Sequence, residues 1–182
     1  MADAPAVFLD RDGVINRRRL DHVKSWDEFE FLPGVLPALA QLRAMATTVV
    51  VITNQSAVGR GLLTSLELRV IHHRMLAAIR EAGGHVTAVY ACLHAPGDGC
   101  GCRKPKPLLF HRASSDLGIA LPDSIMVGDS ATDVQAARAA GCRPVLIGEG
   151  QSAPDNGVLH AADLAGAVGL WRDLALAAAV PC

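Results

Sequence analysis

The sequence predicts an α/β fold in which a mostly parallel sheet of five or more strands carries helices on both faces. Short apolar runs recur along the chain without polar alternation, which is typical of strands that are buried on both faces. Segments with helical periodicity separate these runs, and such alternation of strands and helices favours a parallel sheet. The length of 182 residues suits a single domain, which we expect to span residues 1–182.

Each element follows from its local pattern. The apolar runs expected as strands are Ala6–Leu9, Thr48–Ile52, Val86–Ala91, Ser124–Val127 and Pro144–Ile147. The expected helices are Gly34–Ala46, Pro107–Leu117, Ala131–Ala140 and Ala161–Ala179. A further helix is expected to begin at the capping box Thr64-Ser65-Leu66-Glu67 and to end at Gly83-Gly84. The stretch Gln151–Gly157 predicts a loop. Together these elements describe a doubly wound, Rossmann-like sheet.

Composition and charge exclude several classes of partner. The chain is 51% apolar and 19% charged, as expected of a folded protein that can build its core without disulfides or metals. Its net charge of -1 offers no basic surface for a nucleic acid. No apolar run approaches the roughly 18 residues of a membrane-spanning helix, and the first residues lack the basic region of a signal peptide. We expect a cytoplasmic protein with no nucleic-acid or membrane partner; the oligomeric state stays open, with a monomer as the working expectation.

Polar residues follow four of the expected strands, at the edge of the sheet where such folds bind ligands. These segments are Asp10-Arg11-Asp12, Thr53-Asn54-Gln55-Ser56, Cys92–Lys106 and Gly128-Asp129-Ser130. In an extended segment Asp10 and Asp12 point the same way, and their mutual repulsion calls for a cation. Oxygen ligands suit Mg²⁺, and Asp129 supplies a third carboxylate. Gly13 and Gly128 allow the backbone to turn close to it. The alternative for the Asp10–Asp12 pair is an ordinary turn or N-cap.

Four soft ligands cluster in the segment after the third expected strand. Cys92, His94, Cys100 and Cys102 match a closed tetrahedral zinc site, which would be structural because it has no open position. The alternative is that they are free thiols in a loop. Cys142 is expected to be a small buried apolar residue, and Cys182 a frayed terminal one.

The segments FLDRDGVIN, TNQS, CRKPKP and VGDSATD resemble, in order and spacing, the four motifs of the haloacid dehalogenase superfamily of phosphohydrolases. They are most similar to the capless branch that contains the D-glycero-D-manno-heptose 1,7-bisphosphate phosphatases and the histidinol-phosphate phosphatases. The resemblance spans about Ala6–Gly148, and in the heptose branch a zinc loop lies where this chain has its Cys/His cluster. It implies Mg²⁺-dependent hydrolysis through an aspartyl-phosphate, with removal of the 7-phosphate of heptose 1,7-bisphosphate as the favoured reaction.

The resemblance also implies a role for each matching residue. Asp10 matches the nucleophile, and Asp12 the general acid that later acts as the base. The Asp10 side chain, the Asp12 carbonyl and Asp129 match Mg²⁺ ligands. Thr53, with the N–H groups of Asn54, Gln55 and Ser56, matches the group that binds the transferring phosphoryl, and Lys104 the cation that neutralises its charge. Arg103 matches the contact to the C1-phosphate, and Asp133 the residue that orients Lys104 or the metal's waters. The alternative for Asp133 is an ordinary first-turn carboxylate facing the helix dipole.

Basic residues near the motifs favour a substrate with a second anionic group. The segment between Asn16 and Gly34 is too short for a cap domain, so loops must define the substrate. Arg17–Arg19, Arg60 and Arg103 can supply guanidinium groups for a second phosphate, although Arg17–Arg19 can also be a solvated charge run.

Three rival functions are weighed against this hypothesis. A histidinol-phosphate phosphatase is disfavoured because the substrate's cation would face arginines. A DNA 3′-phosphatase is disfavoured by the pI near 6.6. A non-catalytic zinc-stabilised binding module is disfavoured by the complete set of motif residues. The other histidines and both tryptophans are expected at the surface or in packing: His22, His72, His73, His85, His111, His160, Trp26 and Trp171.

Overall fold

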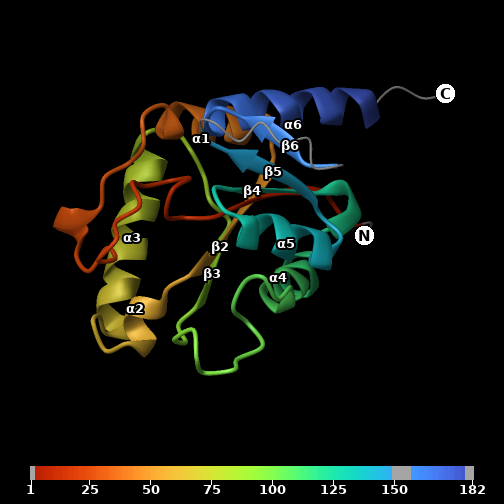
Figure 1. Cartoon of the computed structure of the whole chain (residues 1–182). Helices are drawn as coiled ribbons and strands as arrows, with labels where there is room; N and C mark the ends of the chain where they lie inside the picture. The colour runs from red at the N-terminus through yellow and green to blue at the C-terminus, as the bar shows by residue number, and fades with distance from the viewer. Residues whose placement is uncertain (1–2, 149–156, 179–182) are drawn as a thin grey trace.

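A six-stranded, all-parallel sheet forms the centre of the molecule (Figure 1). The computed structural model describes residues 3–148 and 157–178. The strands lie in the order β3-β2-β1-β4-β5-β6. Their bounds are β1 Ala6–Leu9, β2 Thr48–Asn54, β3 Ala88–Cys92, β4 Ile125–Gly128, β5 Arg143–Ile147 and β6 Leu159–Ala161. The strand order reverses between β1 and β4, so the ligand site of such a sheet falls at their carboxyl ends. The predicted fold class is confirmed.

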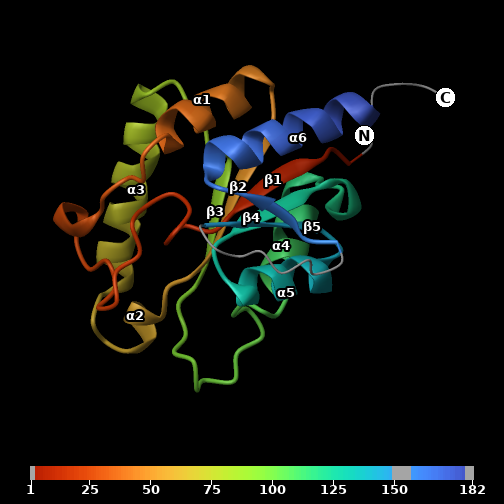
Figure 2. The same ribbon diagram turned by 45° about the horizontal axis from the view of Figure 1, so that its top comes forward.

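Helices cover both faces of this sheet (Figures 1 and 2). Helices α1, α3 and α6 lie on one face and α4 and α5 on the other. The helices are α1 Val35–Ala44, α2 Ser56–Gly59, α3 Ser65–Glu81, α4 Leu108–Leu117, α5 Ala131–Ala140 and α6 Leu164–Ala178, with short 3-10 helices at Trp26–Glu28 and Leu121–Asp123. The predicted capping box begins α3, where Thr64 and Glu67 bond reciprocally.

Burial on both faces explains why the strands read as continuous apolar runs. Val7 and Leu9 point into the core under α1, α3 and α6. Ala6 and Phe8 point to the other face, where the ring centroid of Phe8 lies 5.1 Å from that of Phe110 on α4. All four side chains are at most 1% exposed. Every position of β1 is therefore packed, which no alternating sequence would allow.

The structure corrects several element boundaries. Leu159–Ala161, part of which was expected to begin the last helix, pairs with Val145–Ile147 as β6, so α6 begins only at Leu164. The second strand runs on to Asn54 because Thr53 and Asn54 still pair with β3. Ser56–Gly59, where no helix was predicted, forms the single-turn helix α2. The loop predicted at Gln151–Gly157 lies, except for Gly157, outside the described residues.

No cap domain interrupts the part of the chain that the structure describes. Between Asn16 and Gly34 the described backbone forms only the 3-10 turn Trp26–Glu28 and loops. Trp26, Phe29 and Phe31 pack their rings together, with centroids 5.1 to 6.4 Å apart, and thereby anchor this segment. Within residues 3–148 and 157–178, no helix is long and apolar enough to cross a membrane.

Candidate active site

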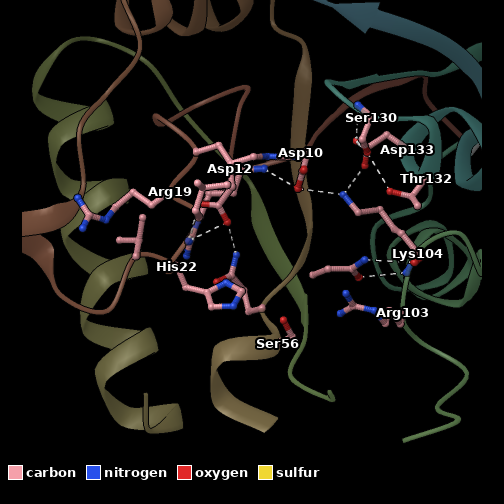
Figure 3. A pocket seen from close by; sticks show the side chains of 16 residues that line it. Asp10, Asp12, Arg19, His22, Ser56, Arg103, Lys104, Ser130, Thr132 and Asp133 are labelled. Atoms are coloured by element: carbon pink, nitrogen blue, oxygen red, sulfur yellow. Dashed lines mark hydrogen bonds and ion pairs between the residues drawn. The ribbon is translucent and has the colours of Figure 1, made fainter. Parts of the chain in front are cut away.

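The carboxyl end of β1 carries a buried carboxylate paired with a buried lysine. Asp10 follows β1 directly, and its Oδ1 lies 2.9 Å from Nζ of Lys104 (Figure 3). The same oxygen accepts a hydrogen bond of 2.8 Å from the backbone N–H of Arg11. Burial raises the pKa of Asp10, and the charge of Lys104 offsets part of that rise. The pair places a carboxylate oxygen that can act as a nucleophile beside a fixed positive charge, as attack on a phosphoryl group requires.

Lys104 is fixed on three sides. Its Nζ lies 2.7 Å from Oδ1 of Asp133 and donates 2.8 Å to the carbonyl of Ile52. The side-chain amide of Asn54 brackets the Lys104 backbone, accepting from its N–H at 3.0 Å and donating to its carbonyl at 3.2 Å. Asp10 and Asp133 raise the pKa of Lys104 above its ordinary value against the opposing effect of burial. The ammonium is therefore charged at neutral pH and held in place by its contacts.

Three side chains hold the carboxylate of Asp12 through hydrogen bonds. The Arg11 guanidinium binds both its oxygens at 2.8 and 2.9 Å, Asn16 Nδ2 donates at 2.9 Å and Gln55 Nε2 at 2.7 Å. Although burial opposes it, Arg11 holds the pKa of Asp12 below its ordinary value. Gln55 also donates 2.9 Å to Oγ1 of Thr53, which links Asp12 to the end of β2. The sequence did not indicate that Arg11 and Gln55 would bind the Asp12 carboxylate. The one sequence signal for Arg11 is its place between the two aspartates.

The residues at and after the end of β2 do only part of what was expected of them. Thr53 is 1% exposed and lies at the carboxyl end of its strand, as expected. The backbone N–H of Gln55, expected to help bind a phosphoryl group, instead donates 2.7 Å to the carbonyl of Cys92. Ser56 starts α2 and lines the pocket described below. Asn54 and Gln55 thus act in this structure mainly through side chains that fix Lys104 and Asp12.

Three carboxylates, one of which is Asp10, converge near Lys104. One oxygen from each of Asp10, Asp129 and Asp133 lies within 4.8 Å of the others. A Cβ atom at Gly13, whose φ is +94°, would lie 1.8 Å from Oδ2 of Asp129, so only glycine allows this approach. Burial raises the pKa of Asp129 to about 6, and its Oδ1 lies 2.6 Å from Nη2 of Arg18. The donor set consists of oxygens with excess negative charge, and it fits Mg²⁺.

Asp133 has its second oxygen bound at the start of α5. Its Oδ2 accepts hydrogen bonds from the backbone N–H and the hydroxyl of Ser130. A Cβ at Gly128 would lie 2.2 Å from that of Asp133, so this glycine also permits a close approach. Asp133 therefore lies in the first turn of α5 and also contacts Lys104, so both expected positions, at a helix start and beside the lysine, apply to it.

Asp10, Asp12, Lys104 and Asp133 line an open pocket of about 370 Å³ (Figure 3). Arg18, Arg19 and His22, from the loop after β1, are among the lining residues. Arg103 projects into the pocket beside Lys104 (Figure 3). Nη1 of Arg103 is buried and has no hydrogen-bond partner in the described part of the chain. The other basic residues named from the sequence lie elsewhere: Arg17 pairs with Glu30, and Arg60 is exposed outside the pocket lining.

The Cys/His cluster is assembled as the spacing indicates. The ligand atoms of Cys92, His94, Cys100 and Cys102 all lie within 4.8 Å of one another. Sγ of Cys92 lies 3.7 Å from Sγ of Cys100, and four atoms placed tetrahedrally about 2.3 Å from a common centre are about 3.7 Å apart. The donor set and its size fit Zn²⁺. Cys142, which is 4% exposed, is a buried core residue as predicted, and it is not one of the four clustered ligands.

Fold and site together define a haloacid dehalogenase-like hydrolase. A HAD-hydrolase-like family model matches residues 101–167. The chain is 44% identical over 144 residues, 79% of its length and 80% of the relative's, to the D-glycero-beta-D-manno-heptose-1,7-bisphosphate 7-phosphatase of Bordetella bronchiseptica. It is also 41% identical over 158 residues, 80% of each chain, to the alpha-anomer enzyme of Mycobacterium tuberculosis.

A solved structure agrees with these relatives. The chain matches the crystal structure of the D,D-heptose 1,7-bisphosphate phosphatase from B. bronchiseptica, complexed with magnesium and phosphate, with a TM-score of 0.87 and 40% identity over 93% of this chain and 98% of that one. The chain belongs to the heptose-1,7-bisphosphate 7-phosphatase family of HAD-like hydrolases, and it is a phosphatase. The predicted family and enzyme class are confirmed.

Proposed function

We propose that this phosphatase removes the 7-phosphate of D-glycero-D-manno-heptose 1,7-bisphosphate. The observation that carries the proposal is the pair of separate cationic positions in one pocket. Lys104 stands beside Asp10, and Arg103 lines the same pocket with a buried Nη1 that has no hydrogen-bond partner among the described residues. A substrate with one phosphate to transfer and another to anchor fits this arrangement. The names of the relatives support the same substrate class.

Asp10 is the proposed nucleophile. Its free carboxylate oxygen forms a bond to phosphorus as the bond to the sugar oxygen breaks, which gives an aspartyl-phosphate. Lys104 lies where it can balance the charge on the transferring group, and Thr53 can donate its hydroxyl proton to the same group. Water then attacks the aspartyl-phosphate and releases inorganic phosphate.

Asp12 is the proposed general acid and base. In the structure it is an anion, the form that a base needs. A negatively charged phosphate next to it would raise its pKa and favour the protonated form that delivers a proton to the sugar oxygen. In the second half-reaction Asp12 accepts a proton from the attacking water, which restores its protonated form.

The metal sites complete the proposal. Asp10 and Asp129 through their side chains, and Asp12 through its carbonyl, would hold Mg²⁺, with Asp133 as support. When bound, Mg²⁺ supplies charge that lets an anion approach a phosphate. Cys92, His94, Cys100 and Cys102 would hold a structural Zn²⁺ that pins the loop leading to Arg103 and Lys104.

The test is hydrolysis of a substrate panel by the purified protein with Mg²⁺. The panel contains both anomers of heptose 1,7-bisphosphate, histidinol phosphate and p-nitrophenyl phosphate, and ³¹P NMR identifies which phosphate is released. We expect the bisphosphates to be preferred, the 1-phosphate to be retained and Asp10→Asn to be inactive. Asp27→Asn, which changes an exposed aspartate, is the matched control. Preference for histidinol phosphate, or an active Asp10→Asn variant, would contradict the proposal.

A further inference from the structure

Helix α3 contributes a histidine to the surroundings of Asp12. His72 was expected at the surface or in packing, but it is half-buried and its Nε2 lies 3.2 Å from Nη1 of Arg11. Arg11 is the side chain that grips both oxygens of Asp12. A chain of contacts therefore runs from α3 through Arg11 to the proposed general acid.

The chemistry of this contact fixes the direction of its hydrogen bond. A guanidinium group has donors only and keeps its charge, so Nε2 of His72 must accept and the ring is neutral. Burial, together with the charge of Arg11, lowers the pKa of His72 to about 4, in agreement with a neutral ring. His72 thus offers Arg11 an acceptor without competing for its charge.

Arg11 depends on such an acceptor because it is removed from solvent. The residue is 0% exposed, its Nε and Nη2 face Asp12, and its Cζ lies 6.0 Å from the ring centroid of Phe29. Nη1 faces away from Asp12, toward His72. Without this acceptor, Nη1 would lack a side-chain partner, and the guanidinium plane could rotate to find another. Rotation of the plane would break the two-oxygen grip on Asp12.

We propose that His72 is a positioning residue for phosphoryl transfer, which acts through Arg11 to hold the Asp12 carboxylate in its working orientation. The inference rests on the proposed function, in which Asp12 delivers a proton to the leaving sugar oxygen. Its effect should depend on the leaving group, because a sugar alkoxide needs that proton and a nitrophenolate does not. A residue that merely stabilises the fold would affect both substrates equally.

The experiment compares kcat/KM on a sugar phosphate and on p-nitrophenyl phosphate, with Mg²⁺ present. This quantity covers the steps up to departure of the leaving group, so slow hydrolysis of the aspartyl-phosphate does not mask the effect. His72→Gln places an amide oxygen where Nε2 lies, whereas His72→Asn is too short to reach Arg11. His72→Leu removes the acceptor altogether. His73→Leu changes the neighbouring, exposed histidine of the same helix and is the control.

We expect His72→Asn and His72→Leu to lose about 10- to 100-fold in kcat/KM on the sugar phosphate and far less on p-nitrophenyl phosphate. His72→Gln should retain most activity on both substrates, and His73→Leu should match the wild type. Equal losses on the two substrates, no loss in His72→Asn, or no rescue by glutamine would overturn the inference. If His72→Leu does not fold, the comparison of glutamine with asparagine still decides.

Failure of the inference and failure of the proposed function are distinguishable. If the wild type prefers heptose 1,7-bisphosphate and releases its 7-phosphate, and Asp10→Asn does not, the proposed function stands and only the His72 variants decide the inference. If Asp10→Asn remains active, the assigned chemistry is wrong before His72 is considered.

Discussion

Lys104 Nζ lies 2.7 Å from Oδ1 of Asp133, and both side chains are only 2% exposed. The contact joins the loop after the Cys/His cluster to the first turn of α5. Because Lys104 also contacts Asp10, one ammonium balances two buried carboxylates. The charges in this group depend on one another, so replacing one of them should affect both stability and chemistry.

Asp133→Asn should lower the free energy of unfolding by about 1–3 kcal/mol. Removing one partner of a buried ion pair costs about 3–5 kcal/mol, and Asp10 remains here to balance Lys104. Chemical denaturation measures the effect, with Asp123→Asn, an exposed carboxylate, as the control. An Asp133→Asn protein as stable as the wild type would show that this pair does not support the fold.

Arg18→Ala should strengthen Mg²⁺ binding by a few-fold, about 2- to 5-fold, because Arg18 competes for Oδ1 of Asp129. The gain is small because half of the Arg18 side chain is exposed and water screens its charge. Calorimetry at pH 8, well above the pKa of about 6 of Asp129, avoids competition from protons. Arg17→Ala, which breaks only the exposed pair with Glu30, should leave the affinity unchanged. Unchanged Mg²⁺ affinity in Arg18→Ala would mean that Arg18 does not compete with the metal.

Cys100→Ser should reduce the zinc content from about one ion per chain to near zero and lower both melting temperature and activity. Both losses follow from the cluster's place immediately before Arg103 and Lys104 in the chain. Elemental analysis of purified protein measures the metal, and Cys142→Ala, which changes a cysteine outside the cluster, should keep it. A metal-free wild type with native stability would contradict the structural zinc.

The parts of the fold that were predictable are those that local sequence encodes. The helix bounds of Ala131–Ala140 and the strand bounds of Ala6–Leu9 agree with the structure because each segment is uniform and ends at a polar residue or glycine. The sixth strand was not predictable, since Leu159–Ala161 is short and interrupted by His160. It forms because β5 offers it an edge to pair with.

The same division holds at the site. Asp10, Thr53 and Asp129 could be placed because they follow strands whose ends meet at one edge of the sheet. His72 could not, because it lies in the middle of a helix about sixty residues from Arg11 in sequence, and only the packing of α3 against the sheet brings the two together. The side-chain contacts of Asn54 and Gln55 were likewise invisible, because their partners are set by tertiary structure.

His72 should make the stability of the protein depend on pH between about 4 and 6.5. Its pKa is about 4 in the folded chain and 6.5 as the ordinary value, so the unfolded chain binds more protons in this window. Stability from the neutral ring is therefore fully present above pH 6.5 and is lost as the pH falls toward 4. The difference in unfolding free energy between wild type and His72→Gln should change by about 2–3 kcal/mol over this range. Parallel pH profiles for the two proteins would contradict a buried, neutral His72.

Arg103→Ala should raise the KM for heptose 1,7-bisphosphate by roughly 10- to 150-fold, because a charge-assisted hydrogen bond is worth about 1.5–3 kcal/mol. Hydrolysis of p-nitrophenyl phosphate, which has no second phosphate, should change far less. Lys104→Ala should instead lower turnover on both substrates, since Lys104 contacts the nucleophile itself. Arg60→Ala, an exposed arginine outside the pocket, is the matched control.

The comparison of Arg103→Ala and Lys104→Ala on the two substrates separates anchoring from chemistry. A selective loss on the bisphosphate would mean that the unpartnered Nη1 of Arg103 is kept free for the phosphate that is not transferred. Equal losses on both substrates would mean that Arg103 serves the reaction or the fold. The second cationic position would then no longer distinguish a bisphosphate from any other phosphate ester, and the choice of substrate would have to come from the loop that carries Arg18 and Arg19.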